Sequence, residues 1–177
     1  MNMIVTILKR INDWVAVVAG IALLGGILLI CAEIVSRALS VPFSISEEIS
    51  GYIMASITSW GISYGLLNHA HVRIDILRVK TSERVRSLLD LISIASVSFV
   101  AIYVATKAIT VLEKSIKSGA LANTALETPL IIPQSIWFAG WIWFAISSTG
   151  LLIVGVYLFF KKRPEEVDSI IGVRAEA

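Results

Sequence analysis

The sequence predicts an all-α integral membrane protein with four transmembrane helices, preceded by a short N-terminal interfacial amphipathic helix. Hydrophobic residues make up 56% of the 177 residues, and the mean hydropathy is +0.84. Uncharged stretches recur along the chain, and the one from Ile49 to Asn68 matches the roughly 20 apolar residues that cross a bilayer core of about 30 Å. Because these stretches take up most of the chain, we expect a single membrane domain covering residues 1–177.

The boundaries of the spans follow from charges and prolines. We place the spans at about 14–37, 47–68, 88–110 and 133–160. The uncharged part of the third span ends before Lys107, whose aliphatic stem lets its ammonium group reach toward the headgroups. Pro129 and Pro133 interrupt the start of the last uncharged stretch, so its helix is expected to begin near Pro133.

The two ends of the chain are predicted to lie outside the spans. Residues 1–13 mix apolar and charged side chains, which favours a short amphipathic helix in the headgroup region, with a frayed terminus as the alternative. The stretch from Trp14 to Ala32 is too long for a signal peptide and no cleavage site follows it, so it should remain as an anchor. Residues 161–177 combine mixed charge with a proline and are expected to form a mostly disordered cytoplasmic tail.

Basic residues indicate the orientation in the membrane. Most of the 15 Lys and Arg residues lie in the N-terminal segment, in the loop after the second span and in the C-terminal tail. The exceptions are Arg37, Lys107, Lys114 and Lys117. Because loops rich in Lys and Arg stay in the cytoplasm, both termini are expected to be cytoplasmic. The net charge of +2 comes without a basic patch interleaved with aromatic residues, so nucleic acid is not expected as a partner.

The sequence offers no catalytic, metal or cofactor site. Cys31 is the only cysteine and lies inside the first span, which excludes disulfide frameworks, CxxC redox pairs and thiolate metal sites. His69 and His71 adjoin each other at the end of the second span, where they suit neither haem ligation between helices nor a metal site on one helix. Together with Arg73 and Asp75, His71 forms a polar motif that we expect to tie the loop to lipid phosphates or to its own backbone.

Acidic residues flank the predicted first outer loop. Glu33 and Arg37 stand four positions apart near the outer end of the first span, which predicts a structural ion pair that Lys107 could join; the alternative is a functional intramembrane acid. Glu47 stands three positions after Ser44, as in a capping box. Glu47 and Glu48 therefore either only begin the second span or form an outward-facing anionic edge that docks a partner.

Small and aromatic residues suggest contact surfaces inside the membrane. Gly61 and Gly65 have the four-residue spacing that lets helices approach closely in lipid, so we expect the second span to be packed between neighbours. The fourth span opens with aromatic side chains, of which Trp137, Trp141 and Trp143 are the candidates for anchors at the membrane interface. The alternative for these aromatic residues is a platform for another subunit.

Several short motifs in a fixed order carry a family resemblance. They are Arg37, Pro42, Ser-Glu-Glu at 46–48, Gly61, Ser-Tyr-Gly at 63–65, HVRIDIL at 71–77 and the later ETPLIIPQSIW. From the first span to the fourth, the chain resembles the small membrane subunit (DctQ type) of TRAP (tripartite ATP-independent periplasmic) transporters. The histidine at position 69 departs from the pattern expected for that family.

The resemblance implies a non-enzymatic four-helix subunit of a transporter complex in the bacterial inner membrane. It would support a large multi-span subunit that carries the substrate path and the sodium sites, so no cofactor is expected on this chain. A periplasmic binding protein would deliver the solute, which in this family is mostly an organic acid or a related compound, for symport with sodium.

Two other classes share some of these features. Small multidrug exporters also have four spans with a glutamate in the first, but they have tight loops and their acid lies at mid-membrane without a following arginine. A membrane anchor of a respiratory enzyme would bind haem or quinone and would need histidines deep in the spans. Both histidines of this chain instead lie at the end of the second span.

Overall fold

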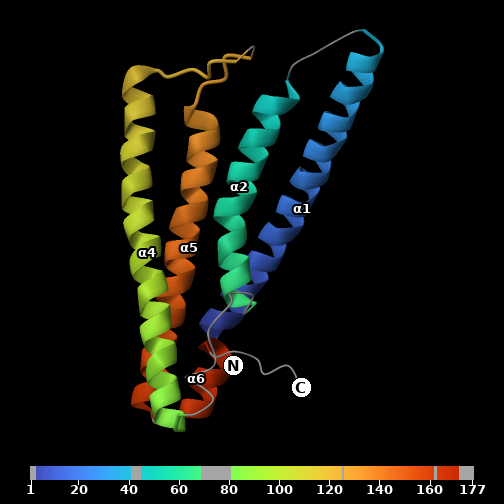
Figure 1. Cartoon of the computed structure of the whole chain (residues 1–177). Coiled ribbons are helices and arrows are strands. Elements are labelled where there is room, and N and C mark those ends of the chain that lie inside the picture. Colours follow the sequence, from blue (N-terminus) through green and yellow to red (C-terminus); the bar gives the residue numbers. More distant parts are fainter. Residues whose placement is uncertain (1–2, 41–44, 69–80, 125, 162, 172–177) are drawn as a thin grey trace.

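The computed structural model describes residues 3–40, 45–68, 81–124, 126–161 and 163–171. These residues form helices α1 (Met3–Ala38), α2 (Ser46–Leu67), α4 (Glu83–Ser118), α5 (Ile131–Phe160) and α6 (Pro164–Ile171). Helices α1, α2, α5 and α4 lie side by side in this order, and α6 lies across one end (Figure 1). Within the described residues, the only β-type pairing is a bridge between Leu121 and Pro129.

Three of the described helices are long and apolar enough to cross a membrane. They are α1 and α4, of 36 residues each, and α5, of 30 residues. Helix α2 has 22 residues, but its serines, glycines and threonine lower its hydropathy and it does not meet the same criterion. It lies between α1 and α5 and packs against both (Figure 1).

Helix α1 is continuous from Met3 to Ala38, so the prediction of a separate short interfacial helix within residues 1–13 is wrong. No proline or glycine interrupts the chain between Met3 and Trp14. Val5 and Leu8 are buried in the apolar core. These apolar side chains therefore pack against the other helices, which extends the first membrane helix toward the N-terminus.

The apolar core is concentrated at the end of the bundle where α6 lies, which we call the core end. It includes Leu66 and Leu67 from α2, Leu151, Val154 and Leu158 from α5, and Val167 and Ile171 from α6. The prediction of a disordered tail is wrong for residues 164–171, because Val167 and Ile171 bury their side chains against α4 and α5. A Cβ atom at Gly155 would lie 3.0 Å from Leu91 Cδ2, so α4 and α5 approach closely here.

The opposite end, which we call the loop end, is shaped by backbone turns. Helix α4 stops at Gly119, whose φ of 59° is left-handed and whose N–H donates to Ile116 O at 3.4 Å. In the loop that follows, Ala122 N donates to Thr128 O at 2.9 Å, and Leu130 N donates to Ala120 O at 3.0 Å. These bonds close a short hairpin that leads directly into α5.

The left-handed turn at Gly119 gives a first prediction. Gly119→Ala should lower the stability of the purified chain by about 1 kcal/mol, because a Cβ atom is disfavoured at positive φ even where space is open. Gly20→Ala is the matched control, since Gly20 lies inside α1 and a Cβ atom added there would meet no atom within 4 Å, and a helical alanine gains roughly 0.5–1 kcal/mol over glycine. Thermal unfolding in detergent measures both; a Gly119→Ala variant as stable as Gly20→Ala would contradict the assignment of the turn.

Candidate functional site

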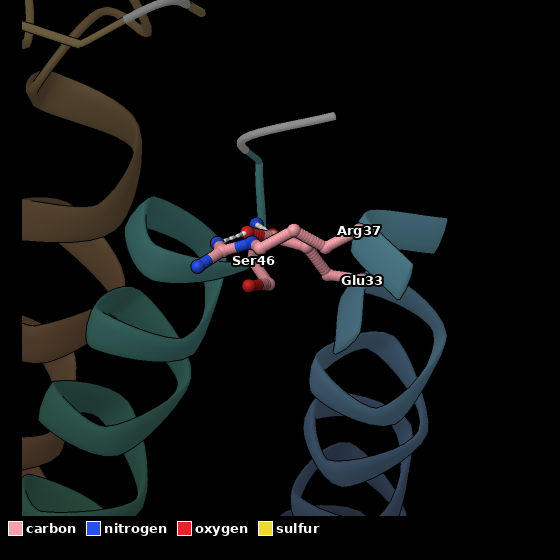
Figure 2. Close-up of polar contacts among 3 residues, drawn as sticks. All are labelled: Glu33, Arg37 and Ser46. Atoms are coloured by element: carbon pink, nitrogen blue, oxygen red, sulfur yellow. Dashed lines mark hydrogen bonds and ion pairs between the residues drawn. The ribbon is translucent and has the colours of Figure 1, made fainter. Parts of the chain in front are cut away.

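The start of α2 is capped by a side chain from α1. Glu33 is buried near the end of α1. Its Oε2 accepts a hydrogen bond from the backbone N–H of Ser46 at 3.0 Å, and Arg37 Nη2 donates to its Oε1 at 2.5 Å. Figure 2 shows Glu33 and Arg37 reaching from α1 to Ser46 at the first turn of α2. Because Ile45, the residue before α2, makes no side-chain cap, Glu33 pairs an N–H that would otherwise have no partner within the helix.

The two bonds of the Glu33 carboxylate differ in importance. The side chain of Arg37 is 70% exposed, so solvent screens its attraction to the Glu33 carboxylate. The bond to Ser46 is buried and joins two helices. Leaving a buried donor without its acceptor costs about 1–3 kcal/mol, so the contact with Ser46 is the stronger constraint on the fold.

Lys107 does not join this pair, so that part of the sequence prediction is wrong. It lies on α4, which is separated from α1 by α5 and α2 (Figure 1). Its Nζ instead lies 5.5 Å from the ring centroid of Tyr103, one turn earlier on the same helix. The spacing of residues along the sequence could not indicate the lateral order of the helices.

Glu47 and Glu48 have different environments. The Glu48 carboxylate accepts a hydrogen bond from Tyr52 OH at 2.8 Å through Oε1 and another from Thr124 Oγ1 through Oε2. Thr124 belongs to the α4–α5 loop, so Glu48 connects α2 with that loop. The side chain of Glu47 is exposed and makes no side-chain hydrogen bond or ion pair within the part of the chain that the structure describes. Ser44, the predicted cap, lies outside the described residues.

The closest approach of α2 to a neighbour does not involve the predicted glycine pair. A Cβ atom at Gly61 would have no neighbour within 4 Å, and Gly65 is half-buried. At Gly140 of α5, by contrast, a Cβ atom would lie 2.8 Å from Ser59 Cβ and 2.9 Å from Trp60 Cδ1. The small residues of α2 that pack inside the bundle are Ser59 and Ser63, both fully buried.

A buried polar network joins three helices nearer the core end. Asn12 of α1 is fully buried. Its Oδ1 accepts hydrogen bonds from Ser63 Oγ of α2 at 2.5 Å and from Trp143 Nε1 of α5 at 3.3 Å, and its Nδ2 donates to Leu8 O at 2.8 Å. The sequence analysis missed this role because it assigned Asn12 to an interfacial helix. The available signal was an amide close to the start of the first uncharged stretch, since polar side chains in membrane helices commonly bond across helices.

The three tryptophan candidates have unequal positions. Trp143 points toward Asn12 inside the bundle, which differs from the expected interface anchor. Trp137 and Trp141 are half-buried and meet edge to face, with ring centroids 6.4 Å apart. Trp141 also packs against Phe144 at 6.1 Å between centroids. The loop motif of His71, Arg73 and Asp75 lies outside the described residues.

Comparison with protein families decides the assignment. The family model described as "Tripartite ATP-independent periplasmic transporters, DctQ component" matches residues 26–161, which is more than half of the chain. The chain belongs to the DctQ family. Searches among curated proteins and among solved structures gave no significant match.

Membership in the DctQ family confirms the resemblance and gives the general role. DctQ proteins are membrane components of tripartite transporters, which also have a large membrane subunit and a periplasmic binding protein, and the family is not an enzyme family. The matched range contains Glu33, Glu48 and Trp143. It does not include Asn12 or α6.

The tight contact at Gly140 gives a second prediction. Gly140→Ala should destabilise the chain by about 1–3 kcal/mol, because the added methyl group would overlap Ser59 and Trp60 where α5 meets α2. Gly61→Ala is the matched control, since its methyl group would enter open space. Unfolding in mixed micelles compares the two variants, and equal stability of both would show that α2 and α5 do not approach closely at Gly140.

Proposed function

We propose that this chain is the small membrane subunit of a sodium-coupled tripartite transporter that imports an organic acid or a related solute. In this proposal it acts as a scaffold for the large transport subunit and helps to dock the periplasmic binding protein. The family match carries the proposal. The chemistry of the described residues supports the scaffold role, because their buried polar side chains include no arrangement suited to carrying a solute.

Three polar side chains of the described residues join elements of this chain to one another. Glu33 bonds to the start of α2, Glu48 to the α4–α5 loop, and Asn12 to α2 and α5. Polar residues on a solute path usually line a water-filled cavity and remain available for the ligand. Two grooves among the described residues are instead lined mainly by apolar side chains. The substrate path and the sodium sites are therefore assigned to the large subunit.

Two exposed surfaces of the bundle differ in composition. Helix α1 exposes large aliphatic side chains along its length, including Ile21, Leu24 and Leu28. Helix α2 exposes the small residues Gly51 and Ala55 beside Met54 and Tyr64, and a Cβ atom added at Gly61 would meet no atom within 4 Å. In lipid, small residues favour close contact between helices, whereas large aliphatic groups pack equally well against acyl chains. We assign the face of α2 with Gly61 and Gly65 to the contact with the large subunit.

The proposed topology has four spans with both termini in the cytoplasm of a bacterium. The 22 residues of α2 would extend about 33 Å at 1.5 Å per residue, which is enough to cross the bilayer core. Its neighbours α1 and α5 shield its serines from lipid on two sides. The loop end then faces the periplasm, where the exposed Glu47 is available to a binding protein and Glu48 is occupied by Thr124 and Tyr52.

Reconstitution tests the proposed division of labour. Vesicles with this chain alone, or with the large subunit alone, should show no uptake of an organic acid driven by a sodium gradient. Vesicles with both subunits and a loaded binding protein should show clear uptake. Introducing Gly61→Leu together with Gly65→Leu should reduce co-purification with the large subunit and lower uptake, because the added side chains would prevent close helix contact.

A leucine at Gly20 provides the control, since this position of α1 also has open space but lies on the face assigned to lipid. This variant should assemble and support uptake normally. Uptake by the small subunit alone would contradict the scaffold role and favour a carrier. Full assembly of the double leucine variant would show that the large subunit binds elsewhere.

A further inference from the structure

The loop between α4 and α5 is attached to α2 without an apolar core. We call its described residues, 119–124 and 126–130, the strap. Its two leucines at the turn, Leu121 and Leu126, are 53% and 41% exposed, and the apolar core lies at the other end of the bundle. Backbone hydrogen bonds within the strap fix its own turn. They do not attach it to α2, so another interaction must determine where it lies.

That interaction is centred on the Glu48 carboxylate. Thr124 of the strap donates its hydroxyl to Oε2, across 76 positions of the sequence, and Tyr52 donates to Oε1 at 2.8 Å. Thr128, at the other side of the hairpin, also lies beside this carboxylate. An ionised carboxylate accepts hydrogen bonds through both oxygens and donates none, which matches the surrounding hydroxyl groups. Its position in the first turn of α2 also places it in the positive field of the helix dipole.

The same residues border an apolar groove. A groove of about 680 Å³ lies between α1, α2 and α5, and its lining includes Trp14, Ile53 and Pro133. Tyr52 and Thr128 belong to this lining as well. The hydrogen bonds around Glu48 therefore lie at the edge of the groove nearest the loop end, so a displacement of the strap would change the shape of that edge.

Other contacts hold α2 in place on both sides of Glu48. Trp60 Nε1 donates to Ile136 O of α5 at 3.0 Å, and the tight contact of Ser59 with Gly140 lies at the same level. Nearer the core end, Ser63 is bonded to Asn12. At the start of α2, Ser46 is bonded to Glu33. A rearrangement at Glu48 would therefore be confined to the strap.

We propose that Glu48, Tyr52 and Thr124 form a clasp that holds the strap closed against α2, and that opening this clasp releases the strap and widens the groove at the loop end. The clasp is a conformational switch within this chain, and the inference does not rest on the proposed function. It assigns Glu48 a role different from that of its neighbour Glu47, which the sequence alone could not separate.

Distance measurements between two spin labels test the clasp in the full-length chain in nanodiscs. After Cys31→Ser, labels at Ala55→Cys on α2 and Asn123→Cys on the strap would occupy exposed positions. With the clasp intact, we expect a narrow distribution of label distances. Glu48→Gln and Thr124→Val should each broaden this distribution and shift it to longer distances, because each variant loses an acceptor or a donor of the clasp.

Glu47→Gln and Thr124→Ser are the matched controls, and both should keep the narrow distribution because they leave the carboxylate and the hydroxyl of the clasp in place. Thr124 is exposed, so its replacement tests the clasp without disturbing the buried part of the bundle. An unchanged distribution in both Glu48→Gln and Thr124→Val would overturn the proposal. Equal broadening in Glu47→Gln and Glu48→Gln would also overturn it, since the effect would then be one of surface charge.

Discussion

The buried hydrogen bond between Glu33 and the Ser46 amide is the constraint on which the arrangement of α1 and α2 depends. A carboxylate at 4% exposure is tolerated in a membrane helix only when its oxygens are paired. Here both oxygens have partners, and one partner is the backbone of the next helix. The end of α1 and the start of α2 are thereby fixed relative to each other, although the apolar core lies at the opposite end of the bundle.

Helix α2 is the element that most needs its neighbours. Its composition is too polar to reach the hydropathy of a membrane span, which α1, α4 and α5 reach. It is held by Glu33 at its first residue, by Gly140 and Ile136 in its middle and by Asn12 near its end. Apart from the bond of Trp60 to Ile136, each contact uses a serine of α2. The serines that make the helix a weak span therefore also let α1 and α5 pack closely against it.

Local patterns in the sequence were sufficient for the helical class and the family, because hydropathy and motif order are properties of consecutive residues. The contacts that define the site were harder to foresee. Asn12 and Trp143 are 131 positions apart, and nothing in the spacing near either residue indicates the other. The pairing of Glu33 with Arg37 lies within one helix turn and was predictable, whereas the bond from Glu33 to Ser46 crosses a loop and required the helix arrangement. The prediction that Lys107 joins Glu33 and Arg37 was wrong for the same reason, since the order of helices across the bundle places α4 away from α1.

The free energy of unfolding of two Glu33 variants tests the central role of this cap most directly. Glu33→Gln keeps a carbonyl oxygen that can accept the Ser46 N–H bond but loses the ion pair with Arg37, whereas Glu33→Leu loses both interactions. If the cap is the main constraint, the leucine variant should be less stable than the glutamine variant by about 1–3 kcal/mol, because the buried amide is left without an acceptor. Equal stability of the two variants in mixed micelles would contradict this account and would show that α2 does not depend on α1 for its cap.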